Sequence, residues 1–279
     1  MEKKDILESL RKSVKEKESI IGVSIGNGRS ANQAFKGGAD ILLALNAGRY
    51  RMSGMPSMMA MLPFANANEM VFDFATKEVI TRVKGIPILF GACAQDPSIG
   101  HDVLIERVLK EGFSGINNFP TVSLFDGNYR VLLEENDEGY AHEVALLRRA
   151  NEKGLFTVAF SVTEEEAVMM AHANVDVLCL HFGWTYINRP KETELKPHVD
   201  KLIDTANRVF EKVLAVKPDM LLAIYGGAIV RNIDIMNRFY TETKAVGYFG
   251  GSVFDVLPVE NSIKDTLESF KHIKRADAL

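Results

Sequence analysis

The chain has 279 residues, of which 47% are hydrophobic and 25% charged, and its formal net charge is −4. This length and apolar fraction suffice for one core of enzyme size, while the slightly acidic balance excludes the basic surface typical of nucleic-acid binding. The charged N-terminus lacks the apolar run of a signal peptide or membrane anchor, and the two cysteines, Cys93 and Cys179, lie in apolar segments. We therefore expect a cytoplasmic protein with reduced thiols and with neither a nucleic-acid nor a membrane partner.

A charged stretch over residues 1–18 predicts an N-terminal helix, and one alternation repeats after it. Short apolar runs typical of strands are each followed by a turn and by a stretch with a 3.6-residue period. The predicted strands are Ile20–Ile25, Ile41–Leu45, Ile86–Phe90, Gly115–Asn117, Phe156–Phe160, Val177–His181, Leu221–Tyr225 and Gly247–Phe249. Helices are predicted at His101–Glu111, Tyr140–Glu152, Glu164–Ala173, Val199–Val216, Asn232–Thr243 and Ile263–Lys274.

This alternation predicts the fold class. Strands that alternate with helices build a parallel sheet, and eight such units close it into a (β/α)8 TIM barrel. We therefore predict a single α/β domain over residues 1–279. The alternative is an open doubly wound sheet, but Gly26-Asn27-Gly28 only approaches the Gly-x-Gly-x-x-Gly sequence, and the acidic residue of a dinucleotide site is missing.

Glycine pairs follow the last two predicted strands. Gly226-Gly227 follows the seventh, and Gly250-Gly251, with Ser252 after it, follows the eighth. Glycine allows the backbone to approach an anion closely, and a helix that begins at such a turn points its N–H groups at the same place. Because the phosphate site of TIM barrels lies after strands seven and eight, these five residues are the predicted phosphate-binding residues.

Residues 47–67, after the second predicted strand, form a methionine-rich loop that exceeds the roughly two to six residues usual in α/β units. The methionines either pack against a neighbouring subunit or the barrel rim, or belong to a mobile lid. Arg49 and Arg51 lie just past the strand end, and guanidinium groups suit carboxylates and phosphates. The alternative is that both are salt-bridged or solvated.

Other polar residues lie at the predicted strand ends, where barrel enzymes carry out chemistry. His181 is predicted to be the acid–base group, or else a core imidazole bonded to the backbone. Asp96 is predicted to be a general base or an Mg²⁺ ligand, or else a helix cap. The further candidates for substrate binding are Asn27, Arg29, Asn117 and Asn118.

Several segments resemble the phosphoenolpyruvate hydrolase-like family, also called TIM-barrel signal transduction proteins. The segments are Asn46–Gly54, Gly91–Pro97, Gly112–Val122, Asp126–Arg130, Tyr225–Ile229 and Leu257–Pro258. The resemblance runs over nearly the whole chain and implies a TIM barrel that forms a homo-oligomer. It also implies substrate-binding roles for Asn46 and Tyr225, and Tyr225 replaces the histidine that is usual in the family.

Certain absences narrow the reaction class. None of the eight predicted strands carries the lysine of a Schiff-base aldolase. The Lys-Cys-Gly-His loop and clustered acidic residues of the phosphonomutase and isocitrate lyase branch are also absent. We predict an enzyme acting on a small anionic metabolite, phosphorylated or carboxylated, by hydrolysis or by cleavage of a C–C or C–P bond. The alternative is a non-catalytic metabolite-binding or signalling domain. The cofactor is left open, with Mg²⁺ as the candidate and Asp96 as its ligand.

Overall fold

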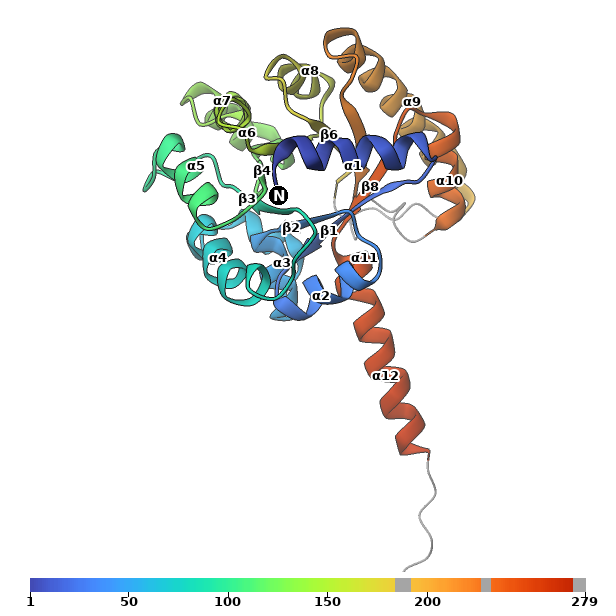
Figure 1. The fold of residues 1–279 in the computed structure, drawn as a ribbon. Coiled ribbons are helices and arrows are strands. Elements are labelled where there is room, and N and C mark those ends of the chain that lie inside the picture. The colour runs from blue at the N-terminus through green and yellow to red at the C-terminus, as the bar shows by residue number, and fades with distance from the viewer. Residues whose placement is uncertain (184–191, 227–231, 273–279) are drawn as a thin grey trace, which may run out of the picture.

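The computed structural model describes residues 1–183, 192–226 and 232–272. Its eight parallel strands close into a barrel in the order β1 to β8, with helices around the outside (Figure 1). The strands are β1 Ile20–Ile25, β2 Ile41–Ala44, β3 Ile88–Gly91, β4 Gly115–Asn117, β5 Phe156–Ser161, β6 Val177–His181, β7 Leu221–Tyr225 and β8 Gly247–Gly250. The predicted TIM barrel is confirmed, and the open sheet is excluded because β8 pairs with β1.

The helices follow the strands in turn. They are α1 Lys3–Lys15, α2 Gly28–Lys36, α3 Asn46–Met52, η1 Ser57–Met61, α4 Ala67–Phe74, η2 Ala75–Ile80, α5 His101–Lys110, η3 Val122–Leu124, α6 Gly127–Glu135, α7 Tyr140–Glu152, α8 Glu164–His172, α9 Glu192–Val216, α10 Ile233–Glu242, α11 Ser252–Asp255 and α12 Leu257–Lys271. Within the described ranges, none of them combines the length and the apolar character that crossing a lipid bilayer requires.

Strand boundaries differ little from the prediction, and the largest shift has a simple cause. β3 begins at Ile88 instead of Ile86. Pro87 lies between them and has no N–H to donate to the ladder, so regular pairing starts after it.

The core has two layers, which follow from the alternation of side chains along each strand. On β2, Ile41 and Leu43 face the barrel interior, whereas Leu42 and Ala44 face the helices. α1 lies across the N-terminal end of the barrel, where its Ile6 and Leu10 join the interior cluster. This leaves the carboxyl ends of the strands as the accessible end.

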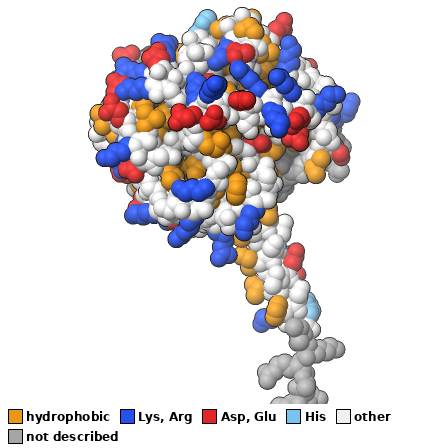
Figure 2. Space-filling view, in the orientation of Figure 1, with side chains coloured by type: hydrophobic (Ala, Val, Ile, Leu, Met, Phe, Trp, Pro, Cys, Tyr) orange, Lys and Arg blue, Asp and Glu red, His pale blue; other side chains and the backbone are white. Residues whose placement is uncertain are grey.

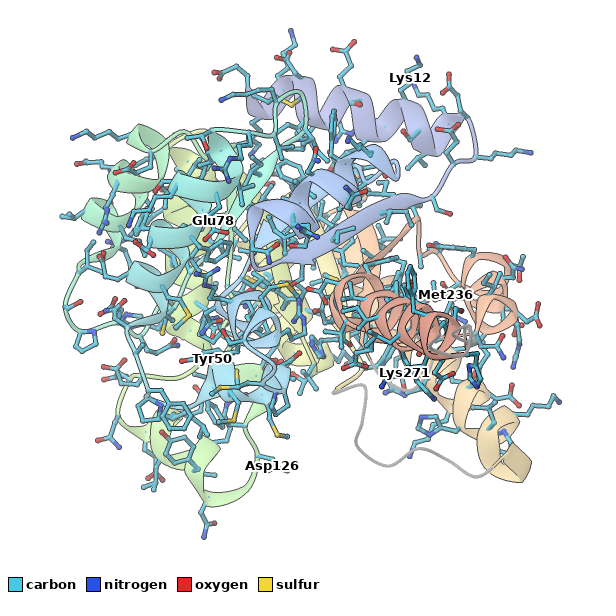
Figure 3. All side chains as sticks on the ribbon, turned by 90° about the horizontal axis from the view of Figure 1, so that it is seen from below. Lys12, Tyr50, Glu78, Asp126, Met236 and Lys271 are labelled. Carbon is cyan, nitrogen blue, oxygen red and sulfur yellow. The ribbon has the colours of Figure 1, made fainter. Side chains whose placement is uncertain are left out.

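Figure 3 shows the same polarity in the side chains. Lys12 of α1 lies at one end of the molecule, and Tyr50 of α3 and Asp126, which precedes α6, lie at the opposite end. Segments that follow β2 and β4 therefore gather at the end away from α1, as parallel strands require.

Residues 47–67 are not an irregular loop throughout, because they hold most of α3 and all of η1. α3 packs directly on the end of β1: a Cβ on Gly48 would lie 2.2 Å from the carbonyl oxygen of Ile25. Met55 and Met58 remain exposed. The sequence did not show this helix because its seven residues are too few to display a period.

Candidate functional site

A small pocket, which we call the mouth pocket, lies at the carboxyl ends of the strands. It is lined by Ala47, Ser57, Phe119, His181, Gly183, Tyr225, Gly226, Tyr248, Gly250, Gly251, Ser252 and Val253. The described residues leave about 20 Å³ of space, room for about one water molecule. Six of the predicted site residues meet here from β6, β7 and β8. The predicted Gly227 falls within 227–231, outside the described residues.

His181 lies at the end of β6 and is 2% exposed. The backbone N–H of Gly183 donates to its Nδ1 at 3.0 Å, so the neutral ring carries its proton on Nε2. Burial lowers the pKa of His181 to about 3. At neutral pH the side chain is therefore an uncharged imidazole, suited to donating a hydrogen bond from Nε2 more than to carrying a proton.

We expect His181 to stay neutral and in this tautomer between pH 5 and 8, because burial disfavours the imidazolium. Two-dimensional NMR of the ring nitrogens across this pH range is the measurement. A titration midpoint for His181 inside this range would contradict the assignment.

Tyr225 ends β7 beside His181, with ring centroids 4.7 Å apart. Its partial burial raises the pKa of Tyr225 to about 12, so the phenol keeps its proton at neutral pH. In the next residue, Gly226, the backbone adopts φ +74° and passes close to the turn after β6. A Cβ there would lie 2.5 Å from the carbonyl oxygen of Gly183 and 3.1 Å from Cε1 of His181.

Gly226→Ala is therefore expected to destabilise the protein by about 2 kcal/mol or more, since it adds both left-handed strain and a backbone clash. Gly154→Ala is the matched control, because Gly154 has φ +88° but would place its Cβ in open space. Urea unfolding compares the two variants. Equal losses would show that the contact with Gly183 is unimportant.

Both predicted anion-binding arginines are engaged within the chain. Arg51 is buried, and its Nε and Nη2 donate to Asp255 at 3.0 and 2.8 Å. Its Nη2 also donates to Ser24 Oγ at 2.9 Å. Arg49 is half-buried and pairs with Glu78 at 3.2 Å. For both arginines the structure therefore shows the salt-bridged alternative. A bound anion would have to compete with these carboxylates.

Arg51 nevertheless supports the mouth pocket, although it does not line it. A Cβ on Gly251 would lie 2.9 Å from the guanidinium carbon of Arg51. The glycine turn after β8 therefore rests directly on the buried guanidinium group. Arg51 supports a wall of the pocket and is absent from its lining.

Four of the other predicted substrate-binding residues have positions outside the mouth pocket. Asn27 caps α2 through the N–H of Ser30. The amide of Asn46 donates to the carbonyl of Ala60 at 3.0 Å, and that of Asn118 donates to Phe160 at 3.0 Å. Arg29 is exposed near the start of α2. The structure therefore does not bring these four to the pocket.

Asn117 is also absent from the residues that line the mouth pocket, but its side chain differs from those four. It ends β4, it is fully buried, and it points into the barrel because its neighbour Ile116 belongs to the outer layer. Neither Oδ1 nor Nδ2 has a hydrogen-bond partner among the described residues, and the same holds for Oη of Tyr248, which lines the mouth pocket. Buried polar atoms are nearly always paired, so Asn117 and Tyr248 have hydrogen-bonding capacity for water or a ligand.

Asp96 lies in the loop after β3, away from the mouth pocket. Its Oδ2 accepts from the amides of Asn66 and Asn68, and its Oδ1 accepts from the N–H and hydroxyl of Ser98. Although partial burial acts to raise it, these donors lower the pKa of Asp96. A carboxylate saturated by four donors does not fit an Mg²⁺ ligand. In the described ranges no group of three or more His, Cys, Asp or Glu side chains could hold a metal ion.

The sequence missed a buried carboxylate near this end of the barrel. Glu143 of α7 is fully buried, and its oxygens accept from Asn118, Thr121 and the N–H of Val122 at 2.6 to 2.7 Å. Burial nevertheless raises the pKa of Glu143 to about 8. Nothing in the sequence distinguishes this residue from exposed helical acids, because its partners come from the segment that follows β4.

Comparison with known proteins places the chain among larger relatives. It is 36% identical over 271 residues to y4pA of Sinorhizobium fredii, described as a transcriptional regulatory protein. It is 35% identical over 274 residues to the tomato (Solanum lycopersicum) ToMV resistance protein Tm-1(GCR237). Both matches cover 96% of this chain, which spans only 44% and 35% of those relatives' own lengths.

Solved structures share the fold at low sequence identity. Oxaloacetate acetylhydrolase in complex with 3,3-difluorooxalacetate superposes with a TM-score of 0.62 at 14% identity, over 100% of this chain and 90% of that one. Phosphonopyruvate hydrolase in complex with oxalate and Mg²⁺ superposes with a TM-score of 0.57 at 12% identity, over 98% and 90%. The family model described as phosphoenolpyruvate hydrolase-like matches residues 5–273. The chain therefore belongs to the phosphoenolpyruvate hydrolase-like family.

Proposed function

We propose that this protein is an enzyme that acts on a small carboxylated or phosphorylated metabolite by hydrolysis or by cleavage of a C–C or C–P bond. The metabolite would bind at the carboxyl end of the barrel around the mouth pocket, whose space of about 20 Å³ must widen to admit it. The observation that carries the proposal is the meeting of a neutral, buried His181 with glycine turns at the carboxyl end of a TIM barrel. This is the end at which barrel enzymes carry out chemistry.

The proposed roles follow from the geometry. Gly250, Gly251 and Ser252 line the pocket, and their backbone N–H groups would hold the anionic group. Cleaving a bond next to a carbonyl places negative charge on its oxygen. A neutral imidazole that donates from Nε2 stabilises such a charge without a competing proton transfer. The protonated phenol of Tyr225, which lines the pocket, is a further donor.

Oxaloacetate and phosphonopyruvate are the compounds to test as substrates, because the names of proteins that share the fold refer to them. We expect turnover of a compound of this class, tested with and without Mg²⁺, and inhibition by oxalate. His181→Gln is expected to lower kcat by roughly 100-fold or more with little change in KM. Asn27→Ala is the control, because Asn27 caps a helix outside the pocket. Absence of both turnover and oxalate binding in the unaltered protein would refute the proposal.

A non-catalytic metabolite sensor is the second candidate. It is favoured by the relatives, which are named for regulation and virus resistance and of which this chain spans less than half. Such a module would bind oxalate or phosphate at the mouth pocket without turnover, and His181→Gln would then change affinity alone. For either function we propose the cytoplasm as the compartment, because both cysteines are free.

A further inference from the structure

Tyr248 places a buried hydroxyl group at the mouth pocket. It lies on β8, is 6% exposed and lines the pocket. Its Oη forms no hydrogen bond with any residue that the structure describes. Buried hydroxyl groups are nearly always paired, because an unpaired one loses its hydrogen bonds to water without replacement. The hydroxyl group of Tyr248 is therefore expected to bind a group that enters the pocket from outside the chain.

The phenol of Tyr248 is fixed by its neighbours. Its ring packs against Phe254 of α11, with ring centroids 5.9 Å apart. The turn after β8 passes close to the hydroxyl group, since a Cβ on Gly250 would lie 2.9 Å from Oη. Burial raises the pKa of Tyr248 well above its usual value, so the phenol keeps its proton at neutral pH. The group is therefore a neutral donor held beside the glycine turn.

The mouth pocket offers neutral donors without a counter-charge. Among the residues described, its lining includes no Lys, Arg, Asp or Glu, and His181 is uncharged at neutral pH. Arg51 lies behind Gly251, but Asp255 accepts from it at 2.8 Å and balances its charge. The outer surface differs: Figure 2 shows Lys and Arg close to Asp and Glu over the face that α1 covers.

These properties suit a carboxylate better than a phosphate group. A carboxylate is planar and has a single negative charge, whereas a phosphate monoester is tetrahedral and carries about 1.5 to 2 negative charges at pH 7. Burial without a counter-charge disfavours the more highly charged group. The space of about 20 Å³ must also widen less for the smaller group. The helix after the turn, α11, has only four residues, so its dipole adds little for either anion.

We propose that Tyr248 is a specificity-determining residue of the mouth pocket, whose hydroxyl group donates to a ligand carboxylate held at the glycine turn after β8. The pocket thereby selects a carboxylate over a phosphate group. This inference deepens the proposed function and rests on it, since it takes the mouth pocket as the ligand site. The sequence gave no sign of this role, because a tyrosine inside an apolar strand is usually a core residue.

The first experiment measures binding by isothermal titration calorimetry, with pyruvate as the carboxylate probe and inorganic phosphate as its competitor. The unaltered protein is expected to bind pyruvate at least about 10-fold more tightly than phosphate. Tyr248→Phe should weaken pyruvate binding at least about 10-fold, because a hydrogen bond to a charged acceptor is lost. Absence of pyruvate binding, phosphate binding of equal strength, or an unchanged affinity in the variant would overturn the inference.

The second experiment compares two tyrosines by urea unfolding. The hydroxyl group of Tyr140 is also buried, but it donates to the carbonyl of Phe160 at 2.6 Å and lies 2.7 Å from Ser161 Oγ. Tyr140→Phe should therefore lower the unfolding midpoint and leave pyruvate affinity unchanged. Tyr248→Phe should do the reverse, leaving the midpoint unchanged or raised while affinity falls.

The two experiments separate this inference from the proposed function. Equal losses of stability in Tyr248→Phe and Tyr140→Phe would mean that the Tyr248 hydroxyl group is bonded within the protein. That result would overturn its ligand role even if turnover is found. Turnover that Tyr248→Phe leaves unchanged, in both kcat and KM, would likewise exclude the inference while the proposed function stands.

Discussion

Arg51→Ala is expected to destabilise the protein by about 3–5 kcal/mol, because it leaves a carboxylate buried without its counter-charge. The side chains of Arg51 and Asp255 are 3% and 1% exposed, and the guanidinium group contacts both carboxylate oxygens. It also donates to Ser24 and Ser57. Removing the guanidinium group leaves all of these acceptors without this donor. Urea unfolding monitored by fluorescence gives the loss directly.

Two comparisons separate this effect from a general sensitivity of the region. Arg49→Ala removes a neighbouring guanidinium whose pair with Glu78 is 37% and 31% exposed, and such pairs contribute about 0–1 kcal/mol. Replacing both members of the buried pair, as in Arg51→Met with Asp255→Leu, should restore much of the loss because no charge stays buried. If Arg51→Ala costs no more than Arg49→Ala, the pair is not important for the fold.

Glu143 is expected to make stability fall as the pH rises from about 5 to 8. Burial raises its pKa in the folded protein from 4.5 to about 8, so the folded chain holds a proton that the unfolded chain releases. In this window the folded state binds more protons, and the free energy of unfolding decreases by about 1.4 kcal/mol per pH unit from this residue. Above pH 8 both states are ionised, and the dependence ends.

The measurement compares the unaltered protein with Glu143→Gln at pH 5.5, 6.5 and 7.5. The variant is expected to be less stable at pH 5.5, because its amide N–H groups face other donors. The difference between the two proteins should then shrink as the pH rises. A difference that stays level or grows would mean that the folded protein holds Glu143 ionised.

Glu166 provides the matched contrast on the neighbouring helix α8. Burial acts to raise its pKa, but hydrogen bonds from Ser123, from the N–H groups of Val162 and Thr163, and from Arg130 lower it below 4.5. A lowered carboxyl pKa stabilises the fold above pH 4.5 and is lost only as the pH falls further. Glu166→Gln should therefore show a constant stability difference between pH 5.5 and 7.5.

The segment after β8 shows what a local sequence pattern can and cannot predict. The glycine pair was recognised from the sequence, because a glycine turn after an apolar run is a local signal. The predicted helix begins at Ile263, whereas α12 begins at Leu257 and has Pro258 in its first turn. Pro is tolerated at this position, where its missing N–H has no helical partner. That α12 projects from the barrel (Figure 1) could not be predicted, because its apolar period would equally suit a helix packed along the barrel.

The sequence by itself determined the eight strands, seven of the fifteen helices in the described residues and the turns at the barrel mouth, because hydrophobic period and glycine placement are local signals that a few consecutive residues carry. Only the tertiary structure decided which polar groups are buried and with whom. Arg51 meets Asp255 across 204 positions of sequence, and Arg49 pairs with Glu78 across 29, so both predicted anion-binding arginines are paired inside the chain. The protonation states of His181 and Glu143 likewise depend on how much water the fold removes around them. Desolvation is set by segments that are distant in sequence, so no local pattern carries it.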